Sequence, residues 1–216
     1  VPSNTFIDTI RHFFSFDNTL MSLPFNCSTA VLFYNKKMVQ DPPHTWEEVE
    51  AISRGLVNKG IIGFTTAWPT AYIFEHFSVV QHILFADGQN GFWAQDNRPL
   101  LFLDHPVFIK RLDTFARWQK DKVYSYEGIM TTQPEDLFAQ ERCGMLMQGA
   151  NRYGILKKLN PNMDIGVVPY PYYEEMNTKP YGINVGGSSL WVLAGYDKKV
   201  YEGVNEFMTY LIKPET

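Results

Sequence analysis

Residues 22–37 read SLPFNCSTAVLFYNKK, and the interpretation of the whole chain depends on this stretch. Apolar residues typical of strands flank four small polar residues, Asn26, Cys27, Ser28 and Thr29, which we call the NCST segment. A strand that enters a core does not ordinarily carry such groups, because buried polar atoms need hydrogen-bond partners. Two explanations are open: the chain turns at this segment, or a polar ligand docks there.

The composition is that of an ordinary soluble globular protein. Hydrophobic residues make up 45% of the 216 residues and charged residues 19%, enough apolar material for a sizeable core. The net charge is −4 with the signs interspersed, and no basic stripe suits a phosphate backbone, so nucleic acid is not a predicted partner. The sequence contains no run of eighteen apolar residues, so it predicts no membrane span.

Strand and helix patterns alternate along the chain, which predicts an α/β fold. The stretch SFDNTL (15–20) has the composition of a turn. Strands are expected at 28–34, 61–66, 143–149, 164–171 and 186–195. Helices are expected at 45–60, 70–88, 104–122, 134–141, 151–159 and 197–212.

Three of these helices begin at residues that favour a helix N-terminus. Thr45 is expected to cap the first, with Glu48 reaching back in a reciprocal capping box. Asp104 or His105 is expected to cap the helix at 104–122, and Asp197 the last helix. The short-range pattern therefore fixes where these helices start.

The signatures of catalysis are weak or missing. His76 and His82 are six residues apart, which places them on different sides of a helix, and no third metal ligand lies nearby in the sequence. GGSSL lacks the spacing of a nucleophile elbow, and GANRYG lacks the lysine of a phosphate loop. No base is identified for Cys27, which we interpret as a packing residue. The sequence predicts no enzyme: no catalytic residue, no metal and no cofactor.

Small polar and glycine residues instead gather where predicted strands end. They are the NCST segment, Thr65–Trp68, Gln148–Asn151 and Gly186–Ser189. In open α/β sheets, ligands bind beyond the carboxyl ends of strands, and helix N-termini add free backbone N–H groups. These four points either converge on one small polar ligand or are simply turns.

Three ordered motifs resemble one known family. They are LPFNCSTAVLFYNKKM (23–38) with PPHTWEEVEAI (42–52), LFAQERCGMLMQGANRY (137–153), and VGGSSLWVLAGYDKKVYEGVNEFMTYLIKPE (185–215). Together they are similar to the extracellular solute-binding proteins of ABC transporters, the maltose-binding-protein-like family. The resemblance implies a periplasmic-binding-protein type II-like fold, in which two lobes close over a ligand by hinge motion.

The resemblance also implies a division of the chain, which looks like the middle of a longer protein. Residues 1–26 would be a hinge-side piece of the first lobe, 27–182 the second ligand-binding lobe, and 183–216 a return strand and helix of the first lobe. The elements at 1–26 and 183–216 would lack their sheet partners and are expected either to be disordered or to pair with a neighbouring chain.

Ligand-binding residues follow from the resemblance position by position. The family's glycerol-3-phosphate binders have a serine where Gly149 stands, and a second cleft tryptophan where Ala71 stands, so these departures leave the ligand's identity open. The implied ligand-binding residues are Asn26, Ser28, Trp68, Gly149, Asn151, Tyr153, Gly187 and Ser188.

The implied function is the substrate-binding component of an ABC importer. Such a protein captures glycerol-3-phosphate, a glycerophosphodiester or a small sugar and delivers it to a permease in the membrane. It is expected in the periplasm, or lipid-anchored outside the cell, after removal of a signal peptide that this sequence does not contain. The alternative is a carbohydrate-active enzyme or its sugar-binding module, which the 15% aromatic content also suits. A receptor or chemotaxis sensor is a third interpretation.

Overall fold

The computed structural model describes residues 6–90, 100–174 and 182–213. The chain divides into two compact units. Unit 1 takes in residues 1–28 and 185–216, and unit 2 takes in residues 29–184. In the described residues, unit 2 contains one five-stranded sheet and unit 1 two two-stranded sheets.

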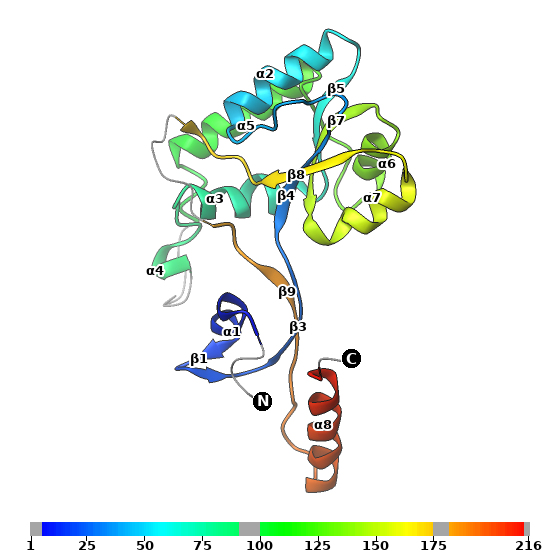
Figure 1. The fold of residues 1–216 in the computed structure, drawn as a ribbon. Helices are drawn as coiled ribbons and strands as arrows, with labels where there is room; N and C mark the ends of the chain where they lie inside the picture. The colour runs from blue at the N-terminus through cyan, green and yellow to red at the C-terminus, as the bar shows by residue number, and fades with distance from the viewer. Residues whose placement is uncertain (1–5, 91–99, 175–181, 214–216) are drawn as a thin grey trace. The chain divides into compact units, whose positions relative to one another are not determined.

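Unit 2 is built on a five-stranded sheet in the order β6-β5-β7-β4-β8 (Figure 1). β5 is parallel to β6 and β7, whereas β4 is antiparallel to both β7 and β8. The carboxyl ends of β5, β6, β7 and β8 therefore share one edge of the sheet, where β4 begins. The strands are β4 (Ala30–Asn35), β5 (Ile62–Thr66), β6 (Tyr124–Ser125), β7 (Cys143–Gly149) and β8 (Ile165–Pro169).

Helices in the connections of unit 2 begin where local sequence signals place them. The capping box at the start of α2 is present: the Glu48 backbone N–H donates to Thr45 Oγ1 at 3.2 Å, and the Thr45 N–H donates to Glu48 Oε2 at 3.1 Å. His105 caps α5, accepting from the Val107 N–H. The helices are α2 (Trp46–Val57), η2 (Thr70–Glu75), α3 (His76–Val80), α4 (Asp87–Asn90), α5 (Pro106–Lys120), α6 (Gln133–Ala139), η3 (Ala150–Arg152) and α7 (Tyr153–Leu159).

The long helix predicted at 70–88 is wrong. It starts as a π-helix, η2, continues as the short α3, and ends at Val80. His82 then takes a left-handed conformation with φ of 54°, which no α-helix continues through. Ile83 is nevertheless buried, so the apolar pattern persists past the helix because non-helical backbone also packs into the core.

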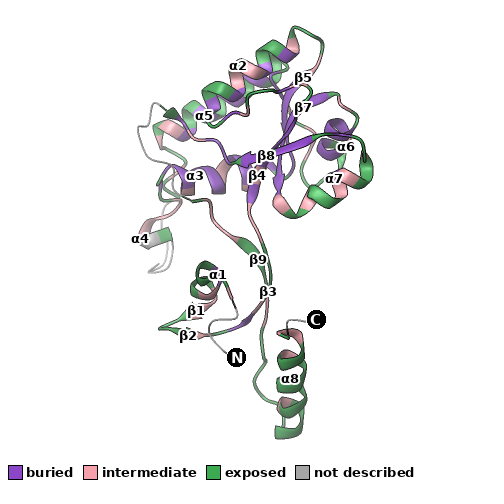
Figure 2. Cartoon of the chain, viewed as in Figure 1, coloured by how far each residue is buried: buried purple, intermediate pink, exposed green. Residues whose placement is uncertain are grey.

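Two apolar clusters cover the two faces of the sheet. Successive residues of β4 point to opposite faces, so Leu32 belongs to the larger cluster and Phe33 to the smaller one. Trp46 of α2 lies fully buried in the larger cluster, with its ring centroid 5.8 Å from that of Phe64 and 5.5 Å from that of Tyr170. Figure 2 shows β7 and most of β4 and β5 as buried.

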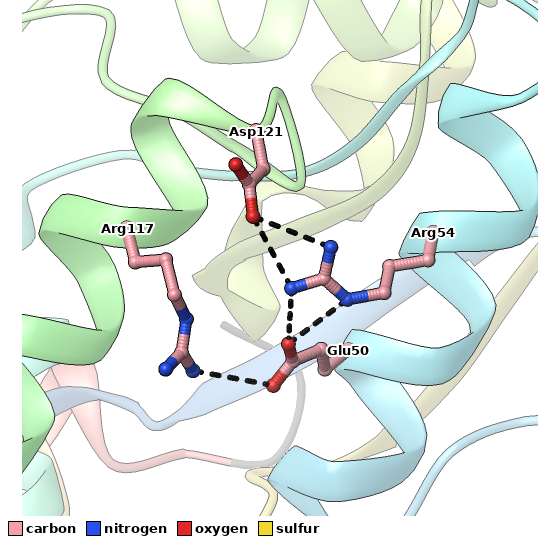
Figure 3. Close-up of polar contacts among 4 residues, drawn as sticks. All are labelled: Glu50, Arg54, Arg117 and Asp121. Atoms are coloured by element: carbon pink, nitrogen blue, oxygen red, sulfur yellow. Dashed lines mark hydrogen bonds and ion pairs between the residues drawn. The ribbon is translucent and has the colours of Figure 1, made fainter.

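An ion-pair network joins the outer surfaces of α2 and α5 (Figure 3). Arg54 Nη2 lies 2.6 Å from Glu50 Oε1 and 3.2 Å from Asp121 Oδ2, and Arg117 Nη2 lies 3.8 Å from Glu50 Oε2. All four side chains are partly exposed to solvent, so each pair contributes at most about 1 kcal/mol. The aromatic core beneath them contributes far more to holding these helices.

Unit 1 begins with α1 (Asp8–Phe13) and a small hairpin of β1 (Ser15–Phe16) and β2 (Thr19–Leu20). The turn predicted at 15–20 is present, and its two central residues, Asp17 and Asn18, have φ of 47° and 59°. Two consecutive positive φ values are those of a type I′ turn, which Asp and Asn tolerate better than most residues.

The second sheet of unit 1 pairs β3 (Leu23–Ser28) antiparallel with β9 (Gly186–Leu190). The strand predicted at 186–195 is therefore too long: Leu190 lies opposite Leu23, where β3 begins, and no strand among the described residues pairs with the residues after Leu190. The last helix, α8 (Lys198–Leu211), is confirmed, with Asp197 Oδ1 accepting from the Val200 N–H at 3.0 Å.

Candidate functional site

The shared edge of the unit 2 sheet brings two of the predicted site residues together. The Ala67 N–H donates to the Met147 carbonyl at 3.2 Å, so Trp68 and Gly149 follow neighbouring strand ends. Gly149 in turn pairs with Ala30 at the start of β4. Within unit 2, two of the four points therefore lie at one edge of the sheet, while convergence on a ligand stays a prediction.

Trp68 is held in an unusual conformation at this edge. Its φ is 44°, in the left-handed region, which costs a non-glycine residue roughly 1–2 kcal/mol. Its side chain is half-exposed, and the π-helix η2 follows two residues later. Backbone strain and π-helical turns both gather at functional sites, and an exposed indole offers a flat surface on which a sugar or polyol can stack.

Asn151 and Tyr153 leave the same edge after β7, in η3 and at the start of α7. Both are exposed, so an amide and a phenol are available to solvent beside Gly149. Arg152 between them points elsewhere: its Nε and Nη2 donate to the two carboxylate oxygens of Glu135 at 2.7 and 2.8 Å. The cation of this segment is therefore already matched by a carboxylate.

The remaining predicted residues lie on the β3–β9 pair in unit 1. Asn26 lies opposite Ser188, and its Oδ1 accepts from the Ser188 backbone N–H at 3.1 Å. Ser28 lies opposite Gly186. Gly187 has φ of 149°, and a Cβ there would overlap the Asn26 carbonyl oxygen, so only glycine fits this close approach. Asn26, Ser28, Gly187 and Ser188 are thus neighbours on two strands.

The NCST segment does not make a turn. Asn26 to Ser28 are the last residues of β3, with a bulge between Pro24 and Asn26, and Thr29 alone separates β3 from β4. The strand predicted at 28–34 starts two residues later, at Ala30. The Thr29 Oγ1 is buried without a hydrogen-bond partner. Of the two explanations for the segment, docking of a polar ligand stays a prediction.

A hydrogen-bond network behind the shared edge was not predicted, although Gln148 belongs to one of the polar stretches that were; its members are Tyr72, Glu135, Gln148 and Arg152. The Tyr72 hydroxyl donates to Gln148 Oε1 at 3.0 Å, and Gln148 Nε2 donates to Glu135 Oε1 at 2.7 Å. Burial raises the pKa of Tyr72, so its hydroxyl stays protonated and available as a donor. The sequence signal was a glutamine in an otherwise apolar strand, CGMLMQG, because a buried amide requires partners.

The reactive side chains elsewhere in unit 2 are occupied in packing. Cys143 is fully buried with its Sγ 3.2 Å from the Met145 carbonyl oxygen, and burial raises the pKa of this thiol to about 12, far from a nucleophilic thiolate. His76 stacks on Tyr72 and its Nδ1 is hydrogen-bonded to the Asn184 side chain. Within the described ranges, no group of three or more His, Cys, Asp or Glu side chains is placed to hold a metal. The helices described there also lack the length and apolar content that crossing a bilayer requires.

Comparison with known proteins gives a consistent result. The family model described as bacterial extracellular solute-binding protein matches residues 1–216. An sn-glycerol-3-phosphate-binding periplasmic protein of Agrobacterium fabrum is 32% identical over 207 residues, covering 90% of this chain and 45% of the relative. The protein of the same name from Shigella flexneri is 30% identical over 220 residues, covering 97% of this chain and 49% of the relative. The chain therefore spans about half the length of the curated relatives it matches.

A solved structure gives the fold. Maltotriose-binding protein of Thermus thermophilus, bound with maltotriose, superimposes with a TM-score of 0.66 at 24% identity, covering 96% of this chain and 53% of that one. The fold is thus of the periplasmic-binding-protein type II class. The relatives and this neighbour are named as binding proteins, and none of these comparisons supports the carbohydrate-active enzyme alternative.

Proposed function

The chain belongs to the bacterial extracellular solute-binding protein family, and we propose that it serves as the solute-capturing component of an ABC importer. In this function the protein binds a small polar solute between two lobes and delivers it to a permease in the membrane. It works in the periplasm, as the names of the relatives say of them, or anchored outside the cell. The periplasmic-binding-protein type II fold supports this proposal.

The observation that carries the proposal is the exposed edge of the unit 2 sheet. Trp68 offers an aromatic face, while Asn151 and Tyr153 offer hydrogen-bonding groups beside Gly149. Stacking surfaces and neutral polar groups are what a sugar or polyol requires, and they need no tuned acid or base. The proposed solutes are glycerol-3-phosphate, for which the relatives are named, a glycerophosphodiester, or a small sugar.

The proposal assigns unit 2 to the second ligand-binding lobe and unit 1 to parts of the first lobe. Asn26, Ser28, Gly187 and Ser188 then supply solute contacts from the strands at which the chain passes between the lobes. Movement of the lobes about these strands would close the site, in the manner of hinge closure around a ligand.

Isothermal titration calorimetry on the complete gene product tests the proposal. The probes are glycerol-3-phosphate, glycerophosphocholine and maltotriose, and we expect heat of binding from at least one. Trp68→Ala should weaken that binding roughly tenfold because the stacking surface is lost. The matched control is Trp191→Ala, since Trp191 is similarly exposed but follows β9 in unit 1. Absence of heat from all three probes contradicts the proposed solute class.

A further inference from the structure

A continuous chain of buried hydrogen bonds lies behind the exposed edge of unit 2. We call Tyr72, Gln148, Glu135 and Arg152 the buried relay. The Tyr72 hydroxyl donates to Gln148 Oε1 at 3.0 Å, Gln148 Nε2 donates to Glu135 Oε1 at 2.7 Å, and Arg152 clamps both Glu135 oxygens. The Glu135 side chain is 4% exposed. Every bond except the last therefore lies out of reach of solvent, where hydrogen bonds hold geometry most firmly.

One end of the buried relay fixes Trp68. The Tyr72 backbone N–H donates to the Trp68 carbonyl at 3.1 Å, and the Tyr72 carbonyl accepts from the Tyr170 hydroxyl at 2.6 Å. Together with the bond from its own hydroxyl to Gln148, Tyr72 is held at three points. Tyr72 thus stabilises the left-handed backbone of Trp68 through its hydrogen bond to the Trp68 carbonyl.

The other end fixes the tip of β7. Gln148 Oε1 accepts from the Gly149 N–H at 2.9 Å as well as from Tyr72, so one amide ties the strand end to η2. The two bonds from Arg152 to Glu135 orient the short turn that carries Asn151 and Tyr153. The same buried groups therefore set the positions of both halves of the exposed edge.

We propose that Tyr72, Gln148 and Glu135 are positioning residues for solute binding, which preorganise Trp68 and the turn after Gly149 without touching the solute. A strained residue such as Trp68 persists only where its surroundings over-determine it, and the buried relay supplies that constraint. A preorganised wall binds more tightly because less freedom is lost on association. The predicted effect on solute affinity rests on the proposed function, whereas the predicted effect on the position of Trp68 does not.

The geometric consequence is tested with 5-fluorotryptophan labelling and fluorine NMR, in which Trp68→Phe assigns the Trp68 resonance. Tyr72→Phe removes one oxygen from the buried relay, so we expect the Trp68 resonance to shift or split. Ser78→Ala is the matched control: Ser78 is buried on α3 and donates to the Glu75 carbonyl, outside the relay. It should leave the Trp68 resonance in place. An unmoved resonance in a folded Tyr72→Phe variant overturns the proposal.

The binding consequence is tested with the same variants. Against glycerol-3-phosphate or maltotriose, we expect Tyr72→Phe and Gln148→Leu to lose roughly threefold to tenfold in affinity, and Ser78→Ala less than twofold. Tyr72→Phe decides the result if Gln148→Leu does not fold. A moved resonance with unchanged affinity overturns the role in binding. If the unsubstituted protein binds none of glycerol-3-phosphate, glycerophosphocholine and maltotriose, the proposed solute class fails, and the fluorine spectrum still decides whether the buried relay positions Trp68.

Discussion

Arg111 of α5 is a buried cation surrounded by aromatic rings instead of acids. It is 1% exposed, and its Nε and Nη2 donate to the Ile73 carbonyl and the Tyr170 hydroxyl, each at 2.9 Å. Its guanidinium carbon lies 4.1 Å from the ring centre of Phe77 and 4.4 Å from that of Trp46. No carboxylate in the described part of the chain forms an ion pair with it, so hydrogen bonds and ring faces alone offset its desolvation.

We expect Arg111→Met to destabilise the protein by about 2 kcal/mol. Methionine removes the charge and with it a desolvation penalty of several kcal/mol. It also removes about 2 kcal/mol of cation–π attraction and about 1.5–3 kcal/mol for each charged hydrogen bond. The two hydrogen bonds and the ring contacts together amount to about 5–8 kcal/mol, which exceeds the desolvation penalty that is removed, so a net cost of about 2 kcal/mol remains.

Arg111→Lys should cost more, about 4 kcal/mol near neutral pH. Lysine keeps a buried charge, but its compact ammonium group cannot reach both acceptors or stack as the flat guanidinium does. Burial lowers the pKa of such a lysine below its unfolded value of about 10.4, so the folded state binds fewer protons than the unfolded state. The Lys variant should therefore gain stability as the pH rises toward about 10, and the Met variant should not.

Guanidinium chloride denaturation followed by far-UV circular dichroism measures these differences. At a denaturant slope of about 4 kcal/mol per M, a separation of about 2 kcal/mol moves the midpoints of the two variants apart by about 0.5 M. Equal stability of Arg111→Lys and Arg111→Met near neutral pH would contradict this prediction. It would mean that a buried ammonium group, which lacks the planar shape of the guanidinium, does not lower the free energy of unfolding.

Three further predictions concern thiols, protonation and surface charge. Cys27 is exposed, so its interpretation as a packing residue is wrong, and a thiol reagent should label it in the native protein. Cys143 is buried and should be labelled only after unfolding; two rapidly reacting thiols in native protein would contradict the burial of Cys143. Burial lowers the pKa of His76 in the folded state, so as the pH falls the unfolded state is protonated first and the free energy of unfolding should decrease below about pH 6.5. In His76→Gln, urea denaturation across that range should show a weaker dependence of this free energy on pH. Arg54→Ala removes two partly exposed ion pairs, with Glu50 and Asp121, so it should cost at most about 2 kcal/mol, and less in concentrated salt. A larger, salt-independent loss would point to packing by the Arg54 side chain.

Local signals in the sequence were sufficient for many elements of the fold. The capping box of Thr45 and Glu48 and the turn at Asp17 and Asn18 depend only on residues within four positions, so the sequence alone specifies them. The helix predicted at 70–88 failed because its apolar periodicity did not distinguish a helix from a buried irregular segment. Tertiary packing decided that outcome.

Part of the candidate site was likewise predicted from the sequence and part was not. The stretches Thr65–Trp68 and Gln148–Asn151 were singled out because each lies at the end of a predicted strand, where ligands of open α/β sheets bind. The resemblance to the family then selected Trp68 and Gly149 within them. The buried relay was missed because its bonds join residues far apart in the sequence: Tyr72 and Gln148 are separated by 76 positions. The sequence pattern of a single segment does not indicate which distant residue its side chains contact. The contact between Tyr72 and Gln148 becomes visible only once the strands and helices are packed together.

The pairing of β3 with β9 has a consequence for how the gene can be rearranged. Ser28 lies opposite Gly186, so the polypeptide leaves for unit 2 and comes back at points about 5 Å apart, the spacing of cross-strand neighbours. Residues 29–184 form one uninterrupted cassette with adjoining entry and exit. Such a cassette suits transplantation into a surface loop of a reporter enzyme, or circular permutation through a short linker, with little disturbance to its host.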